Sequence, residues 1–316
     1  MKKIILANAD YSKNTTDEGE QLQEGLRLAG WTLCGYGYDG ERDIKQILKK
    51  YKPDIILISD VRDLDPSKGG FDKNVYFTNY EALKYYNGFK IMVYKDAGSL
   101  VEFQKQKAEL MGVNALLTYY HFNAVSKIAP WTDKYTLFRT YHTIDNKLKI
   151  WNEPNTNNGK TLLSGALNMQ VYPVRYAFNM FASRLGIDTL QHPGYGNQGA
   201  KNIQYYGLLK RYDTAIMTCS AYNFALRKII EGVCCGINTL TNLPAWDILP
   251  VIDKDIIRFN TPLILNEEAL KKALNTPRKS EKERQEAKEK ALIYYDFRAQ
   301  GKRLDKLIER GYRDEF

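Results

Sequence analysis

Short apolar runs alternate with amphipathic segments along the first half of the chain. The spacing predicts strands at 2–9, 31–38, 53–60, 89–96 and 114–120. Between them, apolar residues recur at helical spacing over 19–30, 41–51, 76–86 and 100–112. The run at 53–60 is apolar throughout, which is typical of a strand buried on both faces of a parallel sheet. This alternation predicts βαβ units and a doubly wound sheet.

The rhythm breaks between 128 and 158, and a polar turn cluster at 151–160 marks the expected boundary between two halves. Afterwards the alternation resumes. Strands are predicted at 160–167, 187–194, 213–220, 237–242 and 255–260, and helices at 174–186, 203–212 and 221–236. Two Rossmann-like halves joined by a hinge predict a ligand site in the cleft between them, beyond the carboxyl ends of the strands.

The last part of the chain has a different pattern. From Thr276 onward it is rich in charges at i,i+4 spacing, with an apolar stripe at Leu304, Leu307 and Ile308. We therefore expect an α/β protein with a C-terminal helical tail that packs back on the body. The predicted divisions are 1–150, 151–275 and 276–316.

Composition supports an intracellular protein with two cores. The chain has 316 residues, of which 44% are hydrophobic, enough for a core in each half. There is no run of about eighteen apolar residues, so we expect no membrane-spanning helix. The N-terminus resembles a first strand rather than a signal peptide, which predicts a cytoplasmic location in a bacterium or a virus-infected host. The four cysteines are expected to be reduced core thiols.

The net charge of +9 favours anionic partners, such as nucleic acid, a phosphorylated substrate or a membrane surface. A lysine-rich composition without a special partner explains the same number equally well. Tyrosine is frequent, with 23 residues. Aromatic rings beside lysines suit stacking on sugars or bases, but they also suit ordinary cores.

Candidate binding chemistry lies at predicted strand ends in the second half. Gly165 follows a strand, and Arg175 stands in the first turn of a helix that opens at Pro173. Backbone donors at such a helix start favour an anion, so Arg175 is a candidate phosphate ligand. The alternative is a surface arginine.

A glycine-rich loop, HPGYGNQG, follows the next predicted strand at 192–199. Its glycines allow the backbone to approach a ligand closely. His192, Gly194 and Tyr195 are then candidates for contact with a base or a sugar. A plain connecting loop is the alternative.

The helix predicted at 221–236 carries Glu231, with Arg227 and Lys228 one turn earlier. A carboxylate can accept hydrogen bonds from both hydroxyls of a ribose, and the nearby cations suit a diphosphate. In isolation this pattern is weak evidence, and a charged surface position is the default interpretation.

Four segments in this order resemble the C-terminal half of GT-B glycosyltransferases, most closely the spore-maturation-type or "glycosyl transferases group 1" branch. They are YPVR at 172–175, HPGY at 192–195, ALRKIIEGVCCG at 225–236 and INTLTNLP at 237–244. YHTID at 141–145 is similar to the linker that ends the N-terminal domain in that family. The resemblance covers about residues 140 to 250, and the first 140 residues match in architecture only.

The resemblance implies a GT-B fold, no bound metal, and a nucleotide-diphosphate sugar, such as a UDP-sugar, as co-substrate. It places Glu231 on the donor ribose, and Arg175, Arg227 or Lys228 on the diphosphate. Retaining members often carry a second glutamate where this chain has Asn223, which leaves the sugar contacts and the stereochemistry open. The full set of expected donor contacts is Gly165, Arg175, His192, Gly194, Tyr195, Asn223, Arg227, Lys228 and Glu231.

The general base is expected in the first half, because an acceptor hydroxyl must lose its proton there in an inverting enzyme. Asp10, Asp96 and His121 follow predicted strands and are the candidates. Each is also a normal loop-capping residue.

The acceptor remains open at this level. The basic charge tilts the prediction toward a hydroxymethylated base in duplex DNA, as in phage enzymes that glucosylate such bases, with the base flipped out for modification. The alternatives are a surface glycan or protein acceptor, and a GT-B module that binds nucleotide or nucleic acid without catalysis. A GT-B-shaped epimerase or phosphorylase is a further alternative.

Overall fold

The computed structural model of the chain describes residues 1–7, 18–35, 39–59, 77–95, 98, 100–190 and 202–315. They divide into two compact units. The first unit combines described residues up to Tyr141 with the C-terminal segment from Phe297, and the second unit spans His142–Asp296. The domain limits at 150 and 275 expected from the sequence stay predictions.

The first unit is built on a parallel sheet with the strand order β2-β1-β3-β4-β5-β6. Every position of β3, β4 and β5 is buried, as expected of strands covered on both faces. In register, Ile5 of β1 lies between Leu33 of β2 and Leu57 of β3. The strands are β1 (Lys3–Leu6), β2 (Thr32–Cys34), β3 (Ile55–Ile58), β4 (Phe89–Tyr94), β5 (Ala115–Thr118) and β6 (Thr136–Arg139).

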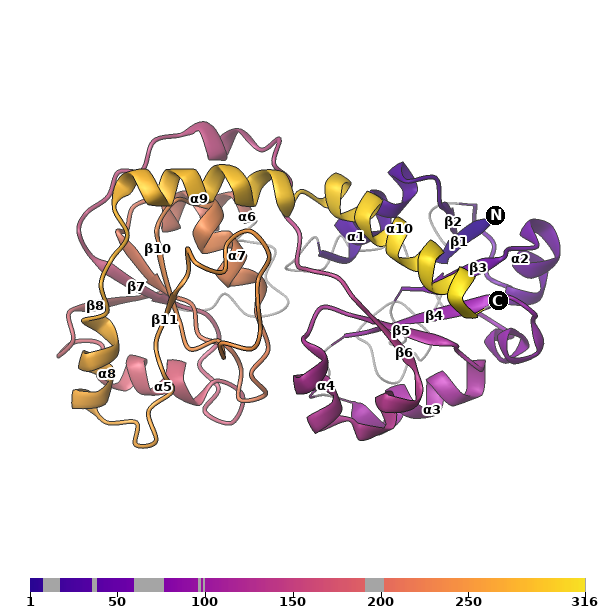
Figure 1. The fold of residues 1–316 in the computed structure, drawn as a ribbon, viewed down its shortest axis with the longest axis horizontal. Coiled ribbons are helices and arrows are strands. Elements are labelled where there is room, and N and C mark those ends of the chain that lie inside the picture. The colour runs from indigo at the N-terminus through magenta and orange to yellow at the C-terminus, as the bar shows by residue number, and fades with distance from the viewer. Residues whose placement is uncertain are drawn as a thin grey trace. The chain divides into compact units, whose positions relative to one another are not determined.

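Helices cover both faces of this first sheet. Helices α1 and α10 lie on one face, and α3 and α4 lie on the other (Figure 1). Asp43 caps α2, because its side chain accepts a hydrogen bond from the backbone N–H of Lys45 at 2.8 Å. The helices are α1 (Glu18–Leu28), α2 (Ile44–Tyr51), α3 (Val101–Met111), α4 (Phe122–Ile128) and α10 (Phe297–Glu315), with 3-10 helices η3 (Tyr80–Tyr85) and η4 (Pro130–Lys134).

Two glycines allow α10 to pack closely on α1. A Cβ atom added at Gly301 would collide with the backbone of Gly25, and one added at Gly25 would collide with the backbone of Phe297. The last helix of the chain is therefore an integral part of the first unit. Helix α9, in contrast, packs on α7 of the second unit. The helical tail expected from the sequence is thus shared between the two units.

The second unit has a parallel sheet with the order β11-β10-β9-β7-β8. The chain passes from β7 to β8 on one side and then returns to β9 on the other side of β7. The strand order therefore reverses between β7 and β9. The strands are β7 (Thr161–Ser164), β8 (Ile187–Leu190), β9 (Thr214–Ile216), β10 (Asn238–Thr241) and β11 (Ile257–Arg258).

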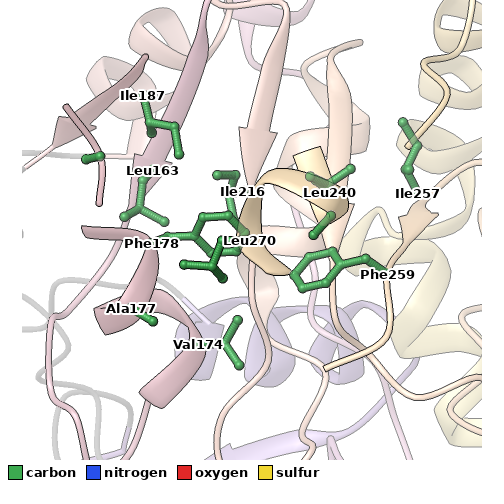
Figure 2. Close-up of a cluster of buried hydrophobic side chains, with 12 residues drawn as sticks. Leu163, Val174, Ala177, Phe178, Ile187, Ile216, Leu240, Ile257, Phe259 and Leu270 are labelled. Carbon is green, nitrogen blue, oxygen red and sulfur yellow. The ribbon is translucent and has the colours of Figure 1, made fainter. Parts of the chain in front are cut away.

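The core of the second unit fills the space between its sheet and the helices α5 and α8. Figure 2 shows the cluster, in which the rings of Phe178 and Phe259 meet edge to face at 5.9 Å. Helices α6, α7 and α9 lie on the opposite face of the sheet (Figure 1). The helices are α5 (Pro173–Met180), α6 (Asn202–Leu209), α7 (Arg227–Cys234), α8 (Glu267–Leu274) and α9 (Glu281–Tyr294), with the 3-10 helix η5 (Lys149–Asn152).

Several local expectations were wrong. The segment 128–158 contains a sixth strand, β6, paired in parallel with β5. This edge strand is short and mostly half-buried, so its apolar pattern is weak. The helix predicted at 221–236 begins only at Arg227, because Asn223 has a left-handed φ of 59° and does not continue a helix. Helix α8 was not predicted, and η3 is a 3-10 helix.

All four cysteines have free, buried thiols. Within the described ranges, no helix is long and apolar enough to cross a membrane.

Candidate functional site

The reversal of strand order between β7 and β9 locates the candidate site. The loops that follow these two neighbouring strands leave toward different helices, α5 and α7. In open α/β sheets, ligands bind beyond the carboxyl ends of the strands at such a switch point. Side chains from α5, α6 and α7 meet the strand ends here.

Arg175 ties the two strand ends together. It lies in the first turn of α5, as expected, but only 2% of the residue is exposed. Its Nε and Nη2 donate to Oγ1 and O of Thr218 at 3.2 and 3.1 Å, and its Nη1 donates to Ala166 O at 3.2 Å. The guanidinium also stacks on Tyr172 at 4.1 Å. The alternative of a surface arginine was therefore wrong, and much of the donor capacity is used inside the protein.

Gly165 makes room for this guanidinium. Its φ is +120°, a backbone conformation that other residues rarely adopt. A Cβ atom at this position would lie 2.5 Å from Nη1 of Arg175. The glycine at the end of β7 is thus explained by its contact with Arg175, and its expected contact with a donor stays a prediction.

Glu231 lies inside α7, with 5% of the residue exposed. Its Oε1 accepts a hydrogen bond from Tyr206 Oη at 3.1 Å and pairs with Arg227 Nε at 3.1 Å. In the part of the chain that the structure describes, Oε2 forms no hydrogen bond. A buried ion pair is expensive to desolvate, and groups of this kind concentrate at functional sites.

Gly232 explains how close α7 approaches the sheet. A Cβ atom there would lie 2.5 Å from Thr239 Oγ1 on β10. Cys234 and Cys235 pack at the same buried junction, where burial raises the pKa of the Cys234 thiol. The glycine and the small thiols thus fit α7 closely against the sheet.

Lys228 is the adjacent cation, and its environment differs from that of Arg227. Its Nζ lies over the ring of Tyr205 at 4.8 Å, and it forms no hydrogen bond or ion pair with any described residue. Burial lowers the pKa of its ammonium group to about 8. Arg175 acts in the same direction, while Glu231 opposes it. The site therefore contains a partly desolvated cation that has no carboxylate partner in contact.

Asn223 lies in the loop between β9 and α7 rather than on the helix. Its Oδ1 is 3.9 Å from Sγ of Cys219, which follows the end of β9. Burial raises the pKa of the Cys219 thiol to about 12, so this sulfur is protonated at neutral pH. A thiol held in this form is a poor nucleophile, so no nucleophilic role is indicated for Cys219.

Other predicted site residues lie elsewhere. His121 is in the first unit, where it caps α4: its Nδ1 accepts from the backbone N–H of Asn123 at 3.1 Å. No group of three or more His, Cys, Asp or Glu residues that could hold a metal occurs among the described positions. Asp10, Asp96, His192, Gly194 and Tyr195 lie outside the described residues.

The sequence reasoning missed Ser164, Tyr205, Tyr206 and Thr218. Thr218 accepts a hydrogen bond from Arg175, and Tyr206 donates one to Glu231. Ser164 shares a hydrogen bond with Tyr205, whose ring faces Lys228. The sequence contains a signal only for Tyr205 and Tyr206, as consecutive tyrosines on a predicted helix, and nothing in that pattern distinguishes them from core aromatics.

No protein-family model matches the chain, and no curated protein matches it. Solved structures do. The chain is similar to a glycosyltransferase from Rickettsia africae ESF-5, with 15% identity, a TM-score of 0.51 and coverage of 99% of this chain and 98% of that one.

It is similar to HepE of Anabaena, solved in complex with UDP and glucose, with 10% identity, a TM-score of 0.56 and coverage of 98% and 100%. It is also similar to AviGT4, a glycosyltransferase involved in avilamycin A biosynthesis, with 11% identity, a TM-score of 0.54 and coverage of 99% and 98%. At these identities the likeness concerns the fold. Together with the two parallel sheets, it shows that this chain has the two-domain α/β fold of GT-B glycosyltransferases with a C-terminal helix, as predicted.

Proposed function

We propose that this protein is a glycosyltransferase that moves a sugar from a nucleotide-diphosphate sugar to an acceptor hydroxyl. The observation that carries the proposal is the pair of groups on α7. Glu231 has one carboxylate oxygen held by Tyr206 and Arg227, and Lys228 stands beside it without an ion-pair partner among described residues. The structure of HepE contains UDP and glucose, which makes a UDP-sugar the first donor to test.

The two groups suit the two polar parts of such a donor. Oε2 of Glu231 is the acceptor for the ribose hydroxyls, because Oε1 is already occupied. The ammonium group of Lys228 balances the diphosphate. When the bond from the sugar C1 to the phosphate oxygen breaks, the diphosphate takes the electron pair, and a fixed cation stabilises this developing charge.

Lys228 is favoured over the two arginines as the diphosphate ligand. Arg175 donates from three nitrogens to Thr218 and Ala166, and Arg227 pairs with Glu231. Reaching a diphosphate would cost these arginines existing contacts. Among the described residues the lysine has no ion pair to break, and its lowered pKa reflects a desolvation penalty that an anion would relieve.

The acceptor side completes the reaction. The acceptor oxygen forms the new bond to C1, and its proton passes to a base. Asp10, Asp96 and His121 stay the proposed bases in the first unit, and His121 is the one whose surroundings are described. Its Nδ1 accepts the capping hydrogen bond of α4 from the backbone N–H of Asn123.

The proposal is tested by thermal unfolding and isothermal titration with UDP, GDP and ADP, and with their sugar conjugates. A ligand at one hundred times its Kd stabilises the folded state by about 2.7 kcal/mol. We expect one diphosphate to give this shift, Glu231→Ala and Lys228→Met to reduce it to about 1 kcal/mol or less at the same ligand concentration, and the exposed control Lys271→Met to keep it. The proposal fails if no nucleotide diphosphate or nucleotide sugar binds.

The acceptor class needs a separate experiment. A hydroxymethylated base in duplex DNA is proposed on the strength of the net charge of +9 alone. The competing acceptors are a surface glycan or a protein. Binding to duplex DNA that weakens steeply with salt supports the first, whereas no binding at low salt assigns the acceptor to the second group. Donor binding without sugar transfer to any acceptor identifies a non-catalytic nucleotide-binding module.

A further inference from the structure

We infer that Tyr205 and Tyr206, neighbours on α6, are the positioning residues of the nucleotide site: Tyr205 places the Lys228 cation, and Tyr206 holds the Glu231 carboxylate. The inference rests on the function proposed above and adds residues that neither the sequence motifs nor the fold assigns. One helix, α6, then positions both side chains that are proposed to contact the nucleotide-sugar donor.

Tyr205 is fixed at the end of the sheet. Its hydroxyl shares a hydrogen bond of 2.7 Å with Ser164 Oγ, the last residue of β7, and Sδ of Met217 lies 3.9 Å away, just after β9. The hydroxyl is thereby anchored between the two strands that flank the switch point. The ring face carries the Nζ of Lys228 at 4.8 Å, which is the geometry of a cation–π contact. Tyr205 thus defines where this lysine lies.

Tyr206 is fixed by Trp151 and by the charged pair on α7. Its ring packs on Trp151 with centroids 4.6 Å apart, and the residue is 1% exposed. Its hydroxyl donates to Oε1 of Glu231 at 3.1 Å and lies 3.5 Å from Nη2 of Arg227, which donates to it. Oε1 therefore has the Tyr206 hydroxyl as a hydrogen-bond donor and the Arg227 guanidinium as an ion-pair partner. This pair of contacts fixes the direction in which Oε2 points.

Trp151 is itself held by a buried cation. Nζ of Lys288, from α9, donates to Trp151 O at 2.6 Å, and Nζ of Lys210, from the turn after α6, donates to Ile150 O at 2.9 Å. Burial lowers the pKa of both ammonium groups. The surface on which Tyr206 packs is thus a fixed part of the second unit, and the tyrosine has little freedom to move with its ligand.

Consecutive residues on a helix point about 100° apart. Tyr205 and Tyr206 therefore reach two different groups, Lys228 and Glu231, which lie three residues apart on the facing helix α7. The two contacts should be separable by substitution. Loss of one tyrosine is expected to impair recognition of one part of the nucleotide and to leave the other part recognised.

The experiment compares the affinities of UDP, 2′-deoxy-UDP and UMP by isothermal titration. For Tyr206→Phe we expect the preference for UDP over 2′-deoxy-UDP to fall at least threefold, with the preference for UDP over UMP unchanged. For Tyr205→Leu we expect the reverse: the preference for UDP over UMP falls about tenfold, and the deoxy preference is retained. Tyr205→Phe keeps the ring and should have a smaller effect. Tyr176→Phe on α5 is the matched control.

A second readout needs no nucleotide. Lysines are converted to ¹³C-dimethyl-lysines, and the signal absent from Lys228→Met is assigned to Lys228. In the wild type its pKa should be about 8, set by burial and by the charges of Arg175 and Glu231. In Tyr205→Leu the pKa should shift measurably, because the variant removes the ring that both contacts the ammonium group and shields it from water. Tyr206→Phe should leave the pKa within a few tenths of the wild-type value.

The outcomes separate this inference from the proposed function. If no nucleotide binds the wild type, the proposed function fails, and the roles at the nucleotide fail with it. If nucleotides bind but each tyrosine variant loses affinity equally for all three ligands, the tyrosines are only structural and the inference is overturned. An unchanged Lys228 pKa in Tyr205→Leu overturns the assignment of Tyr205 alone.

Discussion

The two units each contain a small cluster of partly or fully buried charges, and the clusters differ in how completely their charges are matched. In the first unit, Nζ of Lys3 binds Asp305 Oδ1 at 2.5 Å and Glu309 Oε1 at 2.9 Å. Trp31 Nε1 donates to the same Asp305 oxygen at 2.6 Å. In the second unit, Glu231 has contacts on one oxygen, and Lys228 has no ion pair with any described residue.

This difference separates two uses of buried charge. The Lys3 cluster joins the first strand to the last helix, and its cation has two carboxylates. The strong hydrogen bonds also raise the pKa of Lys3, against the effect of burial. The Lys228 cation has the opposite shift. A matched cluster is expected to stabilise the fold, and a cluster with an unmatched cation is expected to bind an anion.

The largest effect should come from the helix that carries the matched cluster. Gly301→Leu places a side chain where the backbone of Gly25 lies, so α10 can no longer pack on α1. We expect the free energy of unfolding to fall by about 3 kcal/mol in urea denaturation. The neighbouring exposed residue provides the control, and Lys302→Leu should change it by less than about 0.5 kcal/mol. An unchanged midpoint for Gly301→Leu contradicts the packing of α10 on α1.

Lys228→Met should have opposite effects on binding and on stability. Loss of the cation is expected to weaken UDP binding by about 2 kcal/mol, or roughly thirtyfold. The urea midpoint should stay the same or rise, because a desolvated charge has been removed. Isothermal titration and urea denaturation of the same sample measure both. A variant that binds UDP normally but unfolds more easily shows that Lys228 serves the fold.

In the Lys3 cluster, Asp305→Asn is expected to lower stability without changing UDP binding. The amide keeps an acceptor for Trp31 but loses the charge opposite Lys3, and Lys3 still has Glu309. Because the group is partly solvated, we expect a stability loss of about 1.5 kcal/mol. UDP affinity should not change. A loss of UDP affinity without a loss of stability would assign this cluster, too, to ligand binding.

The smallest effect is the pH dependence of nucleotide binding. The ammonium group of Lys228 has a pKa of about 8 in the free protein, and only the protonated form attracts the diphosphate. UDP affinity should therefore fall as the pH rises through 8, by about sevenfold between pH 7 and 9, or roughly 1.2 kcal/mol. Titration calorimetry of Lys228→Met should show this pH step abolished. A step of equal size in that variant assigns the titration to another group.

The sequence predicted the sheets and most helices of this protein better than it predicted the contacts between side chains. The alternation of apolar runs was sufficient for the two parallel sheets, since strands buried on both faces carry a strong pattern. Glu231 and Lys228 were named as candidates because they lie close together in a segment that resembles a family motif, and their roles stay predictions. β6 was missed because an edge strand is half-exposed, and the start of α7 was misplaced because Asn223 adopts a left-handed conformation.

Contacts between distant segments were beyond the sequence. Tyr206 reaches Glu231 only because α6 and α7 cover the same face of the sheet. Which of 23 tyrosines does so depends on the strand order, which periodicity does not reveal. Arg175 was expected to face solvent or a phosphate, and its burial follows from Thr218, 43 positions away in the sequence.

The most direct test is the titration of UDP into the wild type, Glu231→Ala, Lys228→Met and Asp305→Asn under one set of conditions. We predict that the wild type and Asp305→Asn bind UDP with equal affinity, and that each α7 variant binds at least tenfold more weakly. Equal affinity in all four proteins, or no binding by the wild type, would contradict the assignment of Glu231 and Lys228 as the nucleotide site.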